Sequence, residues 1–408
     1  MQEQQELMRE LLLKDASTPA LSVSWCQQGF IHATAFGRTN EAARNPDVDT
    51  NTLFQSSSLS KPVSAAIVLD LLIKHHGAQL GLTLDTPLAE IADGYGSSTL
   101  KKDPYYEKVT IRMVIGQCSG LLNLEEAFTA TPGSRFTYSG VALNFLKQVL
   151  EAKTGQNWET IAQAFFTKVG MKSATFDRPD VDRQVAKGHE TDGTLVTLDL
   201  LPADLAGSLL ITARDYITFL QHCFADDDLK KTLLTDAKLL KPENFPPITS
   251  SVDAKIQWGL GMGIYSDSEK TIVFHWGNNK GFTTFCAMDM KTGDCITCFA
   301  NSDNGPSVFP QIVRPVVGDI APLFQWLAQY CKFRVESTAQ APEAIADMVY
   351  SMTQKSHVEA VHETTHSWKS TRKPQQSQPR YMAPTESSKA KEREKFSSSP
   401  LQTTPRKK

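Results

Sequence analysis

One largely apolar stretch, residues 58–76, constrains the fold more than any other feature of this sequence. As a helix it would be apolar around almost its whole circumference, and such a helix belongs in the middle of a domain. Pro62 would fall in the first turn, where its missing N–H removes no hydrogen bond, and Gly77 is expected to end the helix in the C′ position. The apolar positions are Val63, Ala65, Ala66, Ile67, Val68, Leu69, Leu71, Leu72 and Ile73.

Strand patterns lie near both ends of the chain. Alternating apolar residues at 21–28 and 30–36, around Gly29, predict a β-hairpin. Later strands are expected at 260–265, 271–276, 282–288 and 295–300. A closing amphipathic helix is expected at 309–333. The region between is mostly helical, most clearly at 141–153 and 158–169. We expect an α+β fold: one antiparallel sheet built from both chain ends and flanked by helices, with an inserted helical subdomain.

Composition and charge narrow the class of protein. The 408 residues are 40% hydrophobic, and the formal net charge is −3. Residues 366–408 carry +8 and the remainder −11, a distribution that argues against a nucleic-acid-binding domain. The first residues lack a secretory signal pattern, and no apolar run approaches the ~20 residues of a membrane span. Seven scattered cysteines fit a reducing compartment, so a soluble cytoplasmic protein is expected.

Three regions are expected along the chain: an N-terminal extension (1–15), a catalytic domain (16–333) and a basic tail (334–408). The tail, above all 354–408, is rich in Ser, Pro, Gln and Lys and is predicted to be disordered, because it has too few large apolar residues to offset the entropy of ordering. A solubilising tail is the commoner explanation. A contact with a protein partner, or with secretion machinery, is the alternative.

Ser58 and Lys61 begin the apolar helix with an S-x-x-K pattern. Residues three apart share a helix face, so the lysine can reach the serine hydroxyl. Burial would disfavour the charged ammonium and leave a base able to activate the serine. The alternative is a polar helix start with serine as its cap.

Two further segments accompany this pair: Pro132 to Gly140, reading PGSRFTYSG, and His275 to Phe282, reading HWGNNKGF. With FQSSSLSKPVSAA around Ser58, they resemble, in order and spacing, the three motifs of the serine β-lactamase, penicillin-binding-protein and esterase superfamily, particularly its class C-like branch. The resemblance spans about residues 16–332. It implies a β-lactamase/transpeptidase-like fold and a serine hydrolase that uses no metal or cofactor.

The resemblance also implies roles for individual residues. Ser58 would be acylated, Lys61 would take or relay its proton, and Tyr138 would act with Lys61 and protonate the leaving group. His275 would lie beside the substrate's carbonyl side. The backbone N–H groups of Ser58 and Asn278 would form the oxyanion hole, next to Gly277. Without the resemblance, Tyr138 would be interpreted as a half-buried aromatic with a satisfied hydroxyl, and His275 as a strand-end histidine bonded to the backbone.

Three departures from the family pattern bear on the substrate. Gly140 replaces an asparagine that holds the substrate's amide, and His275 replaces a lysine that attracts a substrate carboxylate. Trp276 stands where a small residue is usual. These changes favour an uncharged ester or a modified amide over a penicillin or a D-alanyl peptide. A β-lactamase, D-aminopeptidase or DD-peptidase, and a catalytically weak binding or effector module, remain the alternatives.

Other candidate motifs are interpreted as structural. The literal Lys291-Thr292-Gly293 has the composition of a hairpin turn. Cys118 lies in GQCSG, where the serine is displaced from the nucleophile-elbow position. Cys295 and Cys298 form a C-x-x-C on an expected strand, where residues three apart point to opposite faces.

Overall fold

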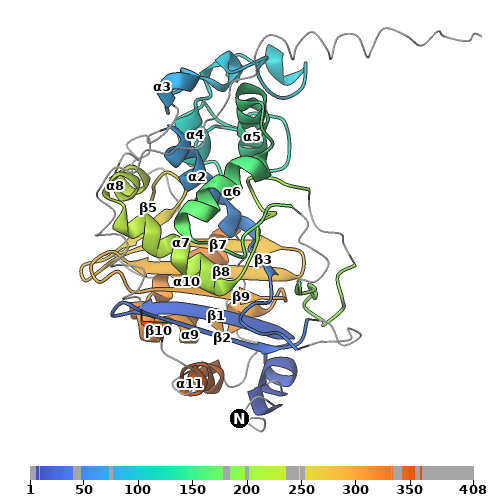
Figure 1. Cartoon of the computed structure of the whole chain (residues 1–408), viewed down its shortest axis with the longest axis vertical. Helices are drawn as coiled ribbons and strands as arrows, with labels where there is room; N and C mark the ends of the chain where they lie inside the picture. Colours follow the sequence, from blue (N-terminus) through green and yellow to red (C-terminus); the bar gives the residue numbers. More distant parts are fainter. Residues whose placement is uncertain are drawn as a thin grey trace, which may run out of the picture.

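The predicted sheet is present and is built from both ends of the chain (Figure 1). The computed structural model describes residues 6–8, 10–39, 47–72, 77–177, 184–197, 202–235, 248, 253–331, 333, 342–353 and 359–360. Eight strands pair throughout antiparallel in the order β10-β2-β1-β9-β8-β7-β6-β5. They are β1 Ala20–Gln27, β2 Phe30–Gly37, β5 Lys255–Trp258, β6 Gly263–Ser266, β7 Thr271–Asn279, β8 Phe282–Asp289, β9 Cys295–Ala300 and β10 Glu359–Ala360. A second sheet pairs β3 (Phe54–Gln55) with β4 (Leu210–Ile211).

Helices cover both faces of the large sheet. The α-helices are α2 Ser60–Asp70, α3 Gly77–Leu80, α4 Ile111–Ile115, α5 Gly140–Thr154, α6 Trp158–Val169, α7 Ala213–Ala225, α8 Asp227–Thr235, α9 Phe309–Val317, α10 Ala321–Cys331 and α11 Pro342–Thr353. Short 3₁₀ or π turns are η1 Leu11–Asp15, η2 Ser57–Leu59, η4 Leu88–Glu90, η5 Leu100–Lys102, η6 Tyr106–Lys108 and η8 Gly305–Ser307. One hydrophobic cluster joins α2, α5, α6 and α7 to one sheet face, and a second joins α9, α10 and α11 to the other.

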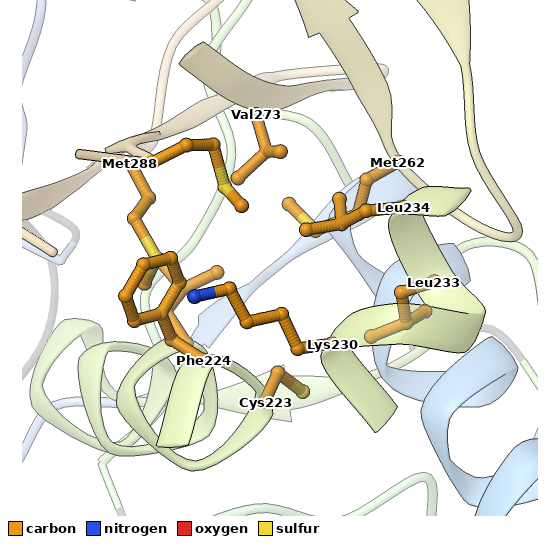
Figure 2. Close-up of a pocket in the computed structure, with 10 residues that line it drawn as sticks. Cys223, Phe224, Lys230, Leu233, Leu234, Met262, Val273 and Met288 are labelled. Atoms are coloured by element: carbon orange, nitrogen blue, oxygen red, sulfur yellow. The ribbon is translucent and has the colours of Figure 1, made fainter. Parts of the chain in front are cut away.

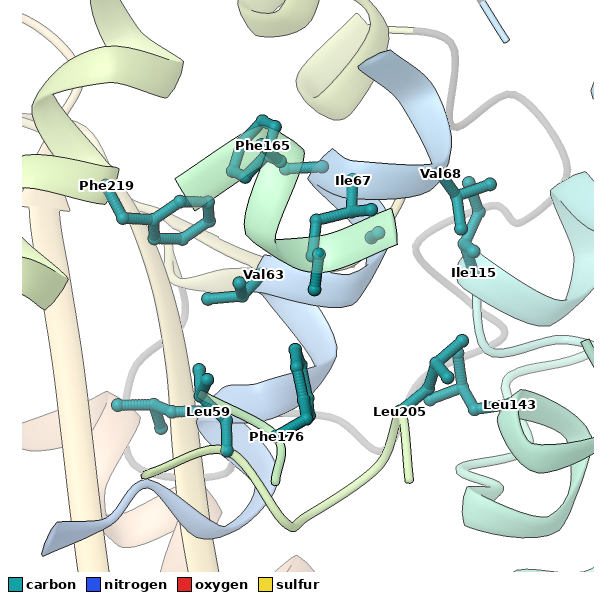
Figure 3. Packing of buried hydrophobic residues seen from close by; sticks show 14 of the residues in the cluster. Leu59, Val63, Ile67, Val68, Ile115, Leu143, Phe165, Phe176, Leu205 and Phe219 are labelled. Atoms are coloured by element: carbon teal, nitrogen blue, oxygen red, sulfur yellow. The ribbon is translucent and has the colours of Figure 1, made fainter. Parts of the chain in front are cut away.

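Helix α2 lies in the centre of the first cluster. Every residue from Ser60 to Asp70 is buried, as its all-round apolar pattern predicts. Figure 3 shows Val63 and Ile67 in one cluster with Phe165 of α6 and Phe219 of α7, and Val68 beside Ile115 of α4. Burying one such side chain contributes about 1.5–3 kcal/mol. Packing from several elements therefore fixes the position of the helix that carries Lys61.

The hairpin β1–β2 and the helices α5 and α6 confirm the sequence predictions closely. Gly77 was expected to end the apolar helix in a C′ position, and this prediction is wrong. Gly77 is the first residue of α3 and is absent from the glycines with positive φ. The last residues of the expected helix, 73–76, lie outside the described residues.

The closing helix expected at 309–333 is two helices, α9 and α10. Gly318 ends α9 with φ +78°, a conformation that glycine adopts without strain. The Asp319 carboxylate then accepts the N–H of Ala321 at the start of α10 (2.8 Å). The strand predicted at 260–265 begins only at Gly263, and β5 was not predicted.

The disordered tail was predicted to begin at residue 334, but a helix and a strand form after that point. Helix α11 lies inside 334–408, and its Ile345 and Val349 are buried in the second cluster. Strand β10 then pairs with Phe30 and Ile31 of β2. Residues 361–408, which hold most of the predicted tail, lie outside the described residues. In the extension predicted at 1–15, Met8 and Leu12 are likewise buried in the second cluster.

Two interpretations of minor motifs agree with the structure. Cys295 belongs to the first cluster and Cys298 to the second, so the two thiols lie on opposite faces of β9. Lys291 and Thr292 lie in the turn between β8 and β9, where the Asp289 carboxylate accepts both of their N–H groups. No helix within the described ranges is both long and apolar enough to cross a lipid bilayer.

Candidate active site

Ser58 lies on a strained turn between β3 and α2. The preceding residue, Ser57, is fully buried and has φ +51°, a left-handed conformation that serine rarely adopts. Strain of this kind persists only where the surroundings enforce it, and it clusters at functional sites. Ser58 itself is only half-buried, unlike the residues on either side of it.

Hydrogen bonds from three elements hold this turn. The Thr284 hydroxyl on β8 donates to the Ser56 carbonyl (2.8 Å), and the Ser56 N–H donates to the Leu209 carbonyl (2.9 Å). Within the turn, the Ser60 hydroxyl donates to the Ser57 carbonyl (2.6 Å). The sheet and the loop before β4 therefore hold the backbone that leads into Ser58.

Lys61 points back at Ser58, as the i, i+3 spacing predicts. Its Nζ donates to Ser58 Oγ (3.0 Å) and to the Ala206 carbonyl (2.8 Å), and the residue is 4% exposed. Burial lowers the pKa of Lys61 to about 7, while the nearby Asp204 carboxylate acts to raise it. A substantial fraction of the amine is therefore neutral near pH 7 and can accept the serine proton.

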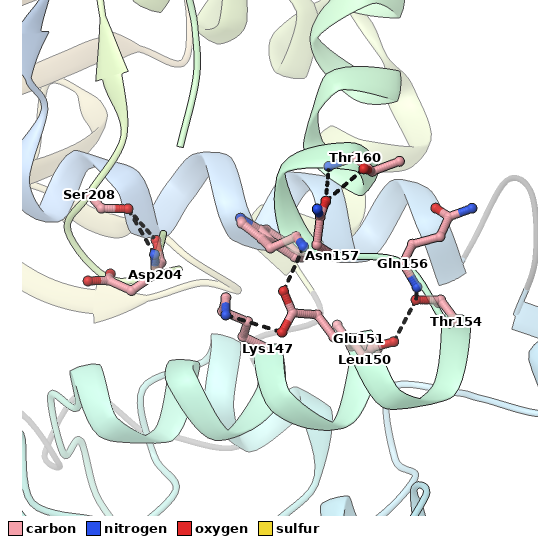
Figure 4. A network of polar contacts seen from close by, with 10 residues as sticks. Lys147, Leu150, Glu151, Thr154, Gln156, Asn157, Thr160, Asp204 and Ser208 are labelled. Carbon is pink, nitrogen blue, oxygen red and sulfur yellow. Dashed lines mark hydrogen bonds and ion pairs between the residues drawn. The ribbon is translucent and has the colours of Figure 1, made fainter. Parts of the chain in front are cut away.

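A tight turn at residues 204–208 presents the Ala206 carbonyl to Lys61. The Asp204 carboxylate accepts the N–H groups of Ala206 and Gly207, both at 2.6 Å. The Ser208 hydroxyl accepts the Asp204 N–H and donates to its carbonyl (Figure 4). In the same view, Glu151 of α5 accepts the Lys147 ammonium and, at the start of α6, the Trp158 N–H. Asp204 therefore holds the turn that presents the Ala206 carbonyl to Lys61, and its negative charge favours the protonated form of Lys61.

Tyr138 comes from the loop before α5 and lies over the lysine. Lys61 Nζ is 4.7 Å from the centroid of the Tyr138 ring. Gln117 forms hydrogen bonds with the backbone on both sides of this tyrosine. Its carbonyl accepts the Thr137 N–H (2.7 Å), and its side-chain Oε1 accepts the Ser139 N–H (2.8 Å). Gln117 is 2% exposed and has φ +54°, a second strained residue next to the site.

The third motif lies along a partly open edge of β7. Strand β6 pairs with β7 only as far as Phe274, whereas β8 follows β7 to Asn279. Gly277 faces the turn that carries Ser58: a Cβ there would lie 2.8 Å from both the Ser56 carbonyl oxygen and Ser57 Cβ. Glycine is needed because any side chain would displace the turn that carries Ser58. The next residue, Asn278, is exposed.

His275 is neutral and completely buried behind the lysine. Its Nδ1 is 2.7 Å from the Trp276 carbonyl oxygen, and because a carbonyl only accepts, Nδ1 carries the proton. Burial and, secondarily, the charge of Lys61 lower the pKa of His275 to about 3. Its Nε2 is a buried acceptor for which the described residues supply no hydrogen bond. The ring cannot provide the fixed cation that a lysine would.

Trp276 and Gly140 are both buried, which the motifs alone do not predict. Trp276 is 4% exposed and stacks on Tyr138, with ring centroids 5.4 Å apart, so it packs behind the tyrosine rather than lining open space. Gly140 is the buried first residue of α5, and its N–H donates to Asn123 Oδ1 (2.8 Å).

The structure therefore brings Ser58, Lys61, Tyr138, His275 and Gly277 together from three segments, with Trp276 behind Tyr138. The prediction missed Gln117, Asp204 and Ala206, which position these residues without carrying a recognisable motif. Burial raises the pKa of Cys118 to about 12, so that thiol is no nucleophile. Among the described residues, no group of His, Cys, Asp or Glu is arranged to hold a metal ion.

A separate apolar hollow lies between α7, α8 and the sheet (Figure 2). Cys223 and Phe224 of α7 face Met262, Val273 and Met288 across it, and none of the predicted site residues lines it. Lys230 Nζ lies 3.7 Å from the Phe224 ring centroid. Burial raises the pKa of the Cys223 thiol, so this thiol is not activated and the hollow is interpreted as a packing feature.

The antiparallel sheet with helices on both faces, and a serine hydrogen-bonded to a buried lysine three residues later, are features expected of the β-lactamase-fold class of serine hydrolases. The sequence matches the family described as Beta-lactamase over residues 5–313, and the chain belongs to that family. No curated protein matches the sequence.

Solved structures share the fold at low sequence identity. An octameric penicillin-binding protein homologue from Pyrococcus abyssi is 21% identical, with a TM-score of 0.60 and coverage of 74% of each chain. A D-amino acid amidase from Ochrobactrum anthropi SV3 is 19% identical (TM-score 0.57, covering 74% of this chain and 91% of that one). The D-alanine carboxypeptidase AmpC from Burkholderia cenocepacia is 18% identical (TM-score 0.55, covering 74% and 93%).

Proposed function

We propose that this protein hydrolyses a small, uncharged ester or amide through an acyl-enzyme on Ser58. The observation that carries the proposal is the hydrogen bond between Ser58 Oγ and the buried Lys61 amine (3.0 Å). A serine needs a neighbouring base to become a nucleophile, and a desolvated lysine can supply one.

The chemical steps follow from this pair. Neutral Lys61 accepts the Ser58 proton as Oγ attacks the substrate carbonyl carbon. The resulting oxyanion would receive the backbone N–H groups of Ser58 and Asn278. The carbon–oxygen or carbon–nitrogen bond then breaks, and the leaving group takes the proton back through Lys61 and Tyr138. Attack by water on the acyl-enzyme repeats the sequence and releases the acid.

The charge around the site supports an uncharged substrate. His275 stays neutral well below pH 6, and Gly140 has no side chain with which to hold a substrate amide. Neither position offers the fixed cation or the amide group described for the lactamase motifs. An ester is therefore favoured over a penicillin, whose carboxylate would find no lysine on β7.

A fluorophosphonate reagent tests the nucleophile directly. Intact mass and peptide mapping of the labelled protein should show one adduct on Ser58, and none in Ser58→Ala. Circular dichroism of both proteins would establish that they are folded. Absence of an adduct on the folded wild-type protein would overturn the hydrolase and favour a binding module. Labelling by penicillin with slow release would instead favour a β-lactamase or a D-peptidase.

The basic tail requires a separate proposal: it serves partner contact, export or solubility rather than catalysis. A truncation after residue 360 would keep α11 and β10, which pair with the sheet and its helices. Unchanged labelling of Ser58 in this truncated chain would support the proposal. A large loss of labelling would place part of the tail at the catalytic site.

A further inference from the structure

The loop before Tyr138 places a carboxamide beside the position that Gly140 leaves empty. Gly140 N–H donates to Asn123 Oδ1 (2.8 Å), and Val141 N–H donates to the Asn123 backbone carbonyl (3.1 Å). Two hydrogen bonds from the first turn of α5 therefore fix both the backbone and the side chain of Asn123. Because a backbone N–H must be met by an oxygen, they also fix which end of the carboxamide faces the helix.

The position of this carboxamide relative to the catalytic pair follows from Gly140. A Cβ built on Gly140 would lie 3.4 Å from Asn123 Oδ1 and 3.4 Å from Ala206 Cβ. Ala206 is the residue whose carbonyl accepts Lys61 Nζ. Asn123 thus lies next to the lysine's anchor, at the place where a side chain on residue 140 would begin. Asn123 is exposed, so its Nδ2 can be reached from solvent.

We infer that Asn123 is a specificity-determining residue, whose Nδ2 donates to a carbonyl oxygen in the acyl part of the substrate. The inference rests on the proposed function and narrows its substrate class to acyl groups that carry an amide or a similar carbonyl close to the scissile bond. The carboxamide that the second motif lacks at Gly140 is supplied from the neighbouring loop. The alternative is that Asn123 only caps α5.

Two boronic acids separate these roles without requiring turnover. Acetamidomethylboronic acid carries an amide carbonyl, and butylboronic acid has the same chain length without one. Both form a bond from boron to Ser58 Oγ, so protection of Ser58 against fluorophosphonate labelling measures the affinity of each. The ratio of the two affinities cancels effects on Lys61 or Ser58 that both compounds share.

In the wild-type protein the acetamido compound should bind about 10-fold more tightly, as expected for one hydrogen bond in a partly desolvated site. Asn123→Asp keeps an oxygen for the Gly140 N–H but loses the donor, and its affinity ratio should fall to within about 2-fold of unity. Asn123→Ala should behave in the same way. Gly140→Asn, added to Asn123→Ala, should restore the preference, because the built Cβ makes only ordinary contacts.

A ratio near unity in the wild-type protein, or an unchanged ratio in both Asn123 variants, would assign Asn123 to capping alone and overturn the inference. Labelling of Ser58 would still be present in that case, so the proposed hydrolase would stand. Absence of labelling in the wild-type protein would overturn both proposals.

Discussion

The two walls of the site are built differently. On one side, Ser58 and Lys61 belong to a turn and a helix inside the core, and α2 is buried along its whole length. On the other side, Tyr138 and Asn123 belong to loops next to Gly140, the first residue of α5, and there Asn123 is exposed and Leu124 is 85% exposed. The first wall is part of the buried core, whereas the second lies next to exposed loop residues and is held by hydrogen bonds from Gln117 and Asn123.

The difference separates chemistry from selectivity. Activation of a serine requires a base whose pKa depends on desolvation, and only a packed core supplies that reliably. Recognition of an acyl group requires polar groups at an accessible surface, and loops provide those at little cost to the fold. The departure at Gly140 fits this division, because Ser58 and Lys61 are retained in the core while the residue at the start of α5 is changed.

Removal of Lys61, the base that we propose on the packed wall, should have the largest effect. In Lys61→Met we expect the rate of Ser58 labelling to fall by about 10³-fold or more, within the range for loss of general-base catalysis plus orientation. Lys147→Met provides a matched control, since Lys147 pairs with Glu151 on α5. Labelling rates by mass spectrometry measure both. A loss below 10-fold would mean that Lys61 is not the base.

The same substitution should stabilise the protein. Lys61 has a folded pKa near 7 against a reference of 10.5, so the unfolded state binds more protons between these pH values. Burial of the amine therefore destabilises the fold most at pH 7 and below, and this penalty fades as the pH rises toward 10.5. We expect Lys61→Met to raise the free energy of unfolding at pH 7 by up to a few kcal/mol, because one pKa unit corresponds to about 1.4 kcal/mol. Urea denaturation at pH 7 and pH 10 should show the gain shrinking with pH.

Loosening the second wall should have a smaller and more selective effect. Gln117→Ala removes the side-chain oxygen that accepts the Ser139 N–H, so one of the two hydrogen bonds beside Tyr138 is lost. We expect kcat/KM for an alkyl ester to fall by roughly 10- to 100-fold, since misplaced catalytic groups lose that much. Fluorophosphonate labelling should fall less, because fluoride needs no proton to leave.

Gln163→Ala, on the surface of α6, controls for the loss of a glutamine side chain. Equal losses with both reagents in Gln117→Ala would indicate general damage to the site. In that case Tyr138 would not be the group that protonates the leaving group.

The packed wall could be predicted from the sequence, and the loop wall only in part. The Ser58–Lys61 contact needs one helix and a three-residue spacing, both of which are local. The apolar pattern of 63–73 likewise indicated that the helix would be buried. Tyr138 and His275 were identified through motif resemblance, but their surroundings were not. That Trp276 would lie behind Tyr138 depends on where β6 stops pairing with β7, and this is a property of the assembled sheet.

The supporting residues were missed for a physical reason. The side chains of Gln117, Asp204 and Asn123 accept hydrogen bonds from backbone N–H groups. Because almost every residue has such an N–H group, no residue pattern in the sequence marks these contacts. The left-handed φ values of Ser57 and Gln117 are also invisible, because neither residue type favours that conformation. The break between α9 and α10 was more accessible, since Gly318 and Asp319 have the composition of a helix end followed by a cap.

Asp204 offers a finer test of the packed wall. Asp204→Asn keeps the oxygen that accepts the Ala206 and Gly207 N–H groups but removes the negative charge that raises the pKa of Lys61. The pKa of Lys61 should therefore fall, and the acid limb of the labelling rate, which rises through about pH 7 in the wild-type protein, should move to lower pH. Asp192→Asn serves as the control, because Asp192 accepts a backbone N–H in an exposed turn. A shift toward higher pH would contradict the assignment of Lys61 as the titrating base.

The smallest expected effect concerns the two third-motif candidates. Lys291-Thr292-Gly293 has the literal lactamase sequence, yet Lys291 is exposed in the β8–β9 turn and its N–H is held by Asp289. His275 lacks that sequence but adjoins Lys61 and Tyr138. Lys291→Ala should therefore leave the labelling rate within about 2-fold of wild type, as is usual for a surface substitution. His275→Ala should lower it, because it opens a cavity beside the lysine and lets in water that restores its charge. If Lys291→Ala were the more damaging of the two, the functional third motif would lie in that turn, and the assignment of His275 to the site would be wrong.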